Sequence, residues 1–136
     1  MKELLYNLIG LKQYIKQYHW LAKGYDNHIL ADKLEDDLDE QIDELAELLL
    51  AIDENTNVSA DYLLREATTR IPQTGLHPEM HVILQNIANM CGVILGICKD
   101  NHSGNELAEL AFSDYVGRLS NSIVRKLYLI QLQFGK

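Results

Sequence analysis

Two histidines and three carboxylates lie close together between residues 19 and 47, with a spacing that could form a metal site. They are His19, His28, Asp32, Asp43 and Glu47. Mixed nitrogen and hard oxygen donors of this kind suit iron, manganese or zinc. His28 and Asp32 are four residues apart, as are Asp43 and Glu47. Each pair is therefore expected to share one face of a helix.

The two pairs are too far apart to bind one metal ion within a single chain. Asp43 follows Asp32 by 11 residues, which is roughly 16 Å along a continuous helix. If two such helices packed antiparallel about a two-fold axis near Asp37 and Leu38, the first pair of one copy would meet the second pair of the other. With that packing, two equivalent metal sites would form at a symmetric dimer interface.

The pattern HW-x3-G, then H-x3-D, then D-x3-E, which begins at His19, resembles the ferroxidase signature of the Dps family, the miniferritins of the ferritin-like superfamily. The resemblance implies that the site binds Fe(II) and oxidises it with hydrogen peroxide or dioxygen. It also implies that the ligands come from two subunits: His19, His28 and Asp32 from one, Asp43 and Glu47 from its partner.

The same resemblance implies an assembly and a physiological role. A Dps-like protein would form a hollow homododecamer, store ferric iron inside it, and limit oxidative stress by removing Fe(II) together with peroxide. In that family a tryptophan at the position of Trp20 lies beside the metal site. From its apolar character alone, Trp20 is expected to be a core anchor.

Two other functions remain open. The acidic run at residues 35–40, followed by Asp43, loosely resembles the Mg²⁺-binding helices of all-α nucleotide pyrophosphatases of the MazG type. That interpretation leaves His19, Trp20 and His28 unexplained. The third alternative is a helical bundle without metal chemistry, which would act as a structural or interaction protein.

For the remaining histidines and acidic residues we expect simpler roles. A second metal site at His77 and His81, with Glu79 between them, is a weaker candidate, and His102 is expected to lie in an exposed turn. The remaining acids of the 35–47 stretch are expected to form a solvated face: Glu35, Asp36, Asp39, Glu40 and Glu44.

Composition limits the classes of protein. The chain has 136 residues, enough for one domain with a single core, and its 12 basic and 20 acidic residues give a net charge of −8. That charge disfavours DNA binding, since affinity for nucleic acids comes largely from Lys and Arg on phosphates. The first residues lead directly into an amphipathic pattern, so we expect a soluble cytoplasmic protein without a membrane span. Cys91 and Cys98, seven residues apart on one helix, are expected to be reduced core thiols.

Apolar residues at three- and four-residue steps predict an all-α fold. We expect long helices at residues 2–23, 27–53, 78–100 and 105–134. A crossover at residues 55–77, with a short helix at 60–68, should let the second and third long helices run parallel. Gly92 and Gly96 should allow a neighbouring helix to approach closely, and Leu107 and Leu110 should face the core. The whole chain is thus predicted to be one ferritin-like four-helix bundle with one long crossover.

Overall fold

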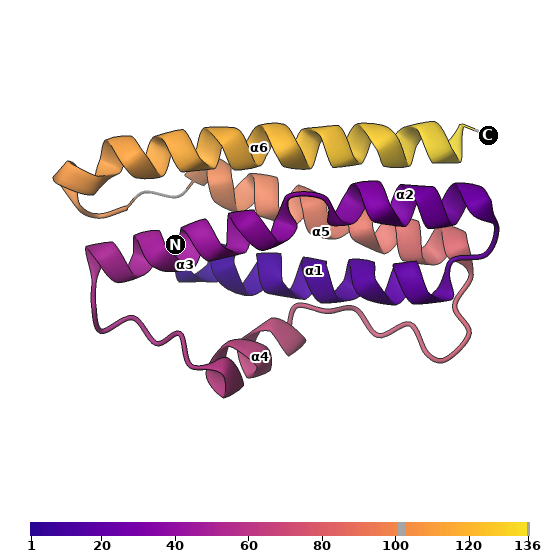
Figure 1. Ribbon diagram of the computed structural model, residues 1–136, viewed down its shortest axis with the longest axis horizontal. Coiled ribbons are helices and arrows are strands. Elements are labelled where there is room, and N and C mark those ends of the chain that lie inside the picture. The colour runs from indigo at the N-terminus through magenta and orange to yellow at the C-terminus, as the bar shows by residue number, and fades with distance from the viewer. Residues whose placement is uncertain (101–102, 136) are drawn as a thin grey trace.

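The computed structural model describes residues 1–100 and 103–135, which are all-helical with no strand. Figure 1 shows α1, α5, α6 and the consecutive α2 and α3 lying along a common long axis, with the short α4 outside them. The helices are α1 (Lys2–Leu21), α2 (Tyr25–Glu35), α3 (Leu38–Ile52), α4 (Ala60–Thr68), α5 (Met80–Asp100) and α6 (Glu106–Phe134).

The contacts between helices define the arrangement. α1 packs against α2, α3, α4 and α5, while α6 packs against α2, α3 and α5. The crossover at residues 53–79 carries α4 along the outside of α1, so α5 begins at the same end of the molecule as α2 and runs parallel to α2 and α3 (Figure 1). The predicted parallel course of these elements and the predicted bounds of the short helix are confirmed.

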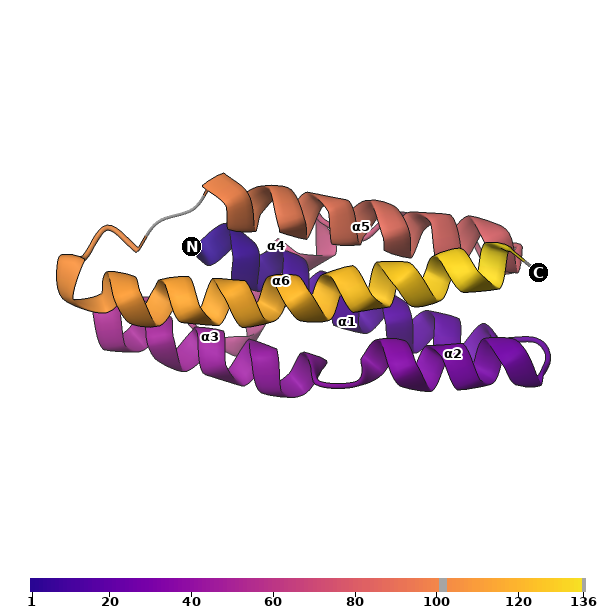
Figure 2. The same cartoon turned by 90° about the horizontal axis from the view of Figure 1, so that it is seen from above.

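The predicted continuous helix at residues 27–53 is wrong, because the chain breaks between α2 and α3. Asp36 is extended (φ −55°, ψ 137°), and Asp37 has a left-handed backbone (φ 63°). Figure 2 shows this break as a thin connection between the two helices. Aspartate is among the few residues that adopt the left-handed region readily. The two pairs of predicted ligands therefore lie on separate helices.

A buried lysine explains the break. Lys126 of α6 is only 4% exposed, and its ammonium group donates to the Asp36 carbonyl (2.8 Å) and to Asp37 Oδ1 (3.0 Å). Ser122 donates to the other Asp37 carboxylate oxygen (2.7 Å). Burial of an ammonium group is costly unless acceptors surround it. A continuous helix would engage the Asp36 carbonyl internally, whereas the break leaves it free for Lys126.

A second polar cluster fastens the crossover to the start of α1. Arg70 donates to both carboxylate oxygens of Glu3 (3.0 and 2.6 Å) and to Glu66 (2.8 Å). Its guanidinium carbon lies 5.0 Å from the centre of the Tyr6 ring, and the Tyr6 and Tyr62 hydroxyls are hydrogen-bonded (3.0 Å). We call Arg70, Glu3, Glu66 and Tyr6 the Arg70 cluster. Every carboxylate in it faces a cation of the same chain.

The core runs through α1, α5 and α6, and α5 is its most apolar helix. By length and composition α5 could also cross a membrane, which the sequence analysis did not anticipate, but one face of it is buried against α1 and α6. Cys91 and Cys98 are free and buried, as predicted. Burial raises the pKa of the Cys91 thiol to about 12, so this thiol is protonated at neutral pH.

Four expectations about apolar packing in α5 and α6 are wrong. Gly92 and Gly96 face outwards, and no atom of the described residues would lie within 4 Å of a Cβ at either position. Leu107 and Leu110, in the first turns of α6, are also exposed. The apolar pattern of α6 is therefore used for burial only from Phe112 onwards.

Candidate metal centre

The turn between α1 and α2 brings the predicted histidines together. Gly24 has a left-handed backbone (φ 85°), which glycine tolerates without steric cost. The Tyr18 hydroxyl donates to Asn27 Oδ1 (2.6 Å), and the Asn27 amide donates to the Lys23 carbonyl (2.7 Å). These bonds fix the end of α1 against the start of α2. As a result, the side chains at positions 19 and 28 face each other.

Three of the five predicted ligands converge within one chain. Ligand atoms of His19, His28 and Asp32 all lie within 4.8 Å of one another. The two imidazole rings have their centres 4.7 Å apart and are tilted by 58°. Among the residues that the structure describes, no other group of three such side chains has this convergence. The spacing of the α2 residues and their pairing with the end of α1 are thus as predicted.

Glu35 lies beside this centre, and the sequence analysis assigned it to the solvated face instead. Its Oε1 lies 3.2 Å from His19 Nδ1, and Asp32 Oδ1 lies 3.3 Å from the same nitrogen. Although these atoms are close, His19 Nδ1 and Glu35 Oε1 are buried without a hydrogen-bond partner among the described residues. We call His19, His28, Asp32 and Glu35 the His19 cluster.

The sequence does contain a signal for Glu35. It follows Asp32 by three residues and His28 by seven, the steps that keep residues on one helical face. Glu35 differs from the neighbouring solvated acids only because α1 lies against its side chain. Glu35 Oε2 lies 3.4 Å from Lys16 Nζ, which leaves Oε1 directed towards His19.

Asp43 and Glu47 lie elsewhere, as exposed residues of α3, and the single chain does not bring them to the His19 cluster. Their predicted contribution from a second copy remains a prediction. Three other acids along this stretch have cationic partners within the chain. Asp37 pairs with Lys126, Asp39 with Lys12, and Glu44 with Arg118. Glu40 and Asp43, which belong to the MazG-type alternative, remain exposed.

The remaining polar candidates are less favourable. His81 lies 3.2 Å from Glu79, but both side chains are exposed, as is His77. His102 lies outside the described residues. Trp20 is 68% exposed rather than a core anchor, because the turn after α1 leaves no helix covering that face.

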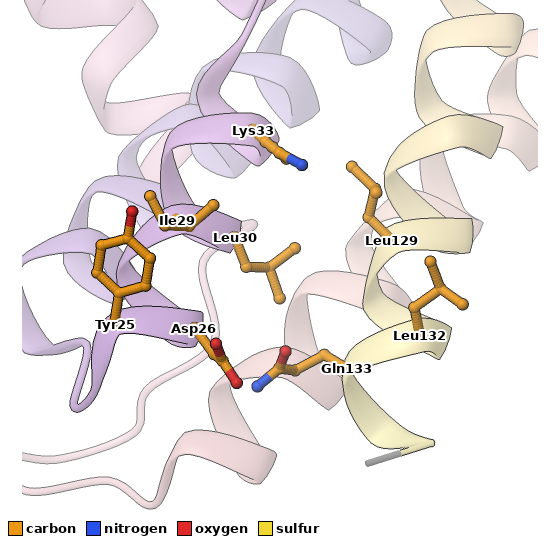
Figure 3. A pocket seen from close by; sticks show the side chains of 8 residues that line it. All are labelled: Tyr25, Asp26, Ile29, Leu30, Lys33, Leu129, Leu132 and Gln133. Carbon is orange, nitrogen blue, oxygen red and sulfur yellow. The ribbon is translucent and has the colours of Figure 1, made fainter.

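A groove on the opposite side of α2 has different chemistry. It lies between α2 and α6 and encloses about 230 Å³. Figure 3 shows its mainly apolar lining: Tyr25, Asp26, Ile29, Leu30, Lys33, Leu129, Leu132 and Gln133. One carboxylate and one amine do not form a ligand set for a metal ion, so the His19 cluster is the better candidate centre.

No protein-family model matches this chain, and no curated protein matches it by sequence.

Proposed function

We propose that this protein is a Dps-like miniferritin that binds Fe(II) and oxidises it at sites shared between two copies of the chain. The observation that carries the proposal is the convergence of His19, His28 and Asp32 within 4.8 Å, at the end of the molecule where α1 meets α2. The long crossover between α3 and α5 agrees with a ferritin-like bundle. Asp43 and Glu47, exposed on α3, are the ligands proposed to come from the second copy.

The types of ligand suit both Fe(II) and the Fe(III) that its oxidation produces. Neutral imidazoles hold Fe(II) without adding charge, whereas carboxylates stabilise the more highly charged Fe(III) product. Two Fe(II) ions each lose one electron. Hydrogen peroxide accepts both electrons, together with two protons, and its O–O bond breaks to give two water molecules. With dioxygen as oxidant, the same two electrons and two protons give hydrogen peroxide.

The oligomer follows from the shared ligands. A two-fold axis near the α2–α3 break would place two equivalent centres on one interface. The proposal extends to a homododecamer that stores ferric iron in a central cavity. Light scattering tests this part separately, since a stable dimer would leave iron oxidation without a storage cavity.

Fe(II) oxidation kinetics test the chemistry. We expect the wild-type protein to accelerate Fe(III) formation with hydrogen peroxide or dioxygen over the protein-free rate. The His28→Ala variant should lose most of that acceleration, because removal of one direct ligand weakens metal binding by at least about tenfold. His81→Ala, which changes an exposed histidine outside the cluster, is the matched control. Equal rates for wild type and His28→Ala would contradict the proposal.

Hydrolysis of nucleoside triphosphates with Mg²⁺ distinguishes the principal rival. A MazG-type enzyme would release pyrophosphate and would not depend on His28. Absence of both activities would favour a structural or interaction protein.

A further inference from the structure

We propose that the groove between α2 and α6 binds a monomeric medium-chain fatty acid, with the acyl chain on the apolar lining and the carboxylate at Lys33 and Arg125. This binding site lies outside the His19 cluster and goes beyond iron oxidation. None of the lining residues is a proposed metal ligand, so acid binding and Fe(II) oxidation can be tested separately.

The middle of the groove is aliphatic, and its polar groups lie at the ends. In Figure 3, Asp26 and Gln133 lie at one end and the Lys33 side chain at the other. A peptide segment placed between them would bring N–H and C=O groups against side chains that offer no hydrogen bonds, which is costly. An acyl chain has no polar group along its length, so it suits this lining. Four aliphatic side chains form it: Ile29, Leu30, Leu129 and Leu132.

The apolar groove continues into a second hollow that is richer in charge. This hollow encloses about 250 Å³ and shares Lys33 and Leu129 with the first. Because the two have walls in common, one ligand could extend from the first into the second. Three cations and two acids line the second hollow, together with Ser122 and Leu129: Lys33, Arg125, Lys126, Asp36 and Asp37.

Two of these three cations are available to a ligand. Lys126 is already paired with Asp37. Among the described residues, by contrast, no ion pair joins Lys33 or Arg125 to an acid, and both side chains are exposed. The remaining acid, Asp36, balances only one of the two. A carboxylate would supply the missing charge and accept hydrogen bonds from the ammonium and guanidinium groups.

The ends of the groove set the orientation and the length of the ligand. Asp26 repels a carboxylate, so the acyl chain should end there and the carboxylate should lie near Lys33. Lys33 follows Asp26 by seven residues on α2, which is roughly 10 Å along the helix. A span of this size suits a medium-chain acyl group rather than the longer chains of membrane lipids.

Isothermal titration calorimetry with decanoate at neutral pH, below the concentration at which it forms micelles, tests the proposal. We expect one equivalent per chain. Octanoate, which is shorter by two methylene groups, should bind about 15-fold more weakly, since each buried methylene contributes about fourfold.

Two variants test the two halves of the groove. Leu132→Asn should weaken the binding of decanoate and of decan-1-ol alike, by at least about fivefold. Lys33→Gln should weaken decanoate by about fivefold and leave decan-1-ol unchanged, because the alcohol has no charge. Arg65→Gln, which removes an exposed cation of α4, is the matched control and should bind both ligands as the wild type does. Circular dichroism shows whether each variant remains helical.

Four results would overturn the proposal. The first is a wild type that does not bind decanoate, and the second is binding that neither Lys33→Gln nor Leu132→Asn weakens. Sedimentation with phosphatidylglycerol vesicles, without binding of decanoate, would show instead that the groove faces a membrane. A lower mass of Leu132→Asn than of wild type in light scattering, again without binding of decanoate, would show that a second copy covers the groove.

Discussion

The Arg70 cluster and the His19 cluster lie towards opposite ends of α1, and each places two carboxylates around one side chain. In the Arg70 cluster the chain supplies the cation itself, and the guanidinium donates to both acids. In the His19 cluster, a nitrogen and an oxygen approach each other without a hydrogen bond. The first cluster is thus satisfied within the chain, whereas the second is the proposed position of a metal ion from outside it.

The largest effect is expected when one ligand is removed in one variant and a different ligand in a second variant, and the two variants then exchange subunits. His28→Ala and Asp43→Ala should each reduce Fe(II) oxidation at least about tenfold. When equal amounts of the two variants exchange subunits, half of the dimers are mixed, and one of the two sites in each mixed dimer is complete. Activity should therefore return to about a quarter of the wild-type rate. Proven exchange without recovery would place the whole oxidation site within one chain.

Metal binding should stabilise the protein through the His19 cluster but not through the Arg70 cluster. Zn²⁺ at about 100 times its dissociation constant adds roughly 2.7 kcal/mol, which should raise Tm by several degrees. Asp32→Asn should reduce this gain, while Glu66→Gln in the Arg70 cluster should retain it. The gain should shrink in acid, since ligands must be deprotonated to bind metal. Equal rises in Tm for Asp32→Asn and wild type would show that Zn²⁺ binds outside the His19 cluster.

Arg70→Met should destabilise the fold without changing metal binding. The pair with Glu3 is partly exposed, so we expect a loss of about 1 kcal/mol in the free energy of unfolding, measured by urea denaturation. The matched control is Arg65→Met in α4, whose ion pair with Asp61 is largely exposed, and it should have almost no effect.

The pH dependence of this loss has a definite sign. The hydrogen bond from Arg70 holds the pKa of the Glu3 carboxyl below its ordinary value of 4.5. A group whose pKa is lowered by folding stabilises the protein above its unfolded pKa, and this contribution disappears as pH falls through the folded pKa. The difference between wild type and Arg70→Met should therefore be full at pH 7 and shrink below pH 4.5. A difference that grows in acid would contradict this account.

The smallest expected effect is in DNA binding, which we expect to be undetectable. The net charge of −8 repels the phosphate backbone, and cations such as Arg70 and Arg118 are already paired with acids. We expect no gel-shift retention at submicromolar protein, neutral pH and physiological salt. Retention under these conditions would overturn the prediction.

The sequence predicted the features that depend on local spacing. Helical periodicity placed His28 and Asp32 on one face, and turn residues around Ser59 gave the bounds of α4. It did not predict the break at Asp36 and Asp37, because the cause is Lys126, which lies 90 residues beyond Asp36. Glu35 was missed for a related reason. From sequence alone, acidic residues along one helical face are expected to be solvated. The position of the neighbouring helix is needed to show which of them is covered.

The break between α2 and α3 has a consequence for the order in which the protein is made. All four residues of the His19 cluster lie within α1 and α2, in the first part of the chain to be synthesised. Lys126, which fixes the break, is added 90 residues after Asp36, or roughly 5–18 s later at ordinary rates of synthesis. The proposed ligands of α1 and α2 are therefore synthesised well before the lysine that sets the direction of α3.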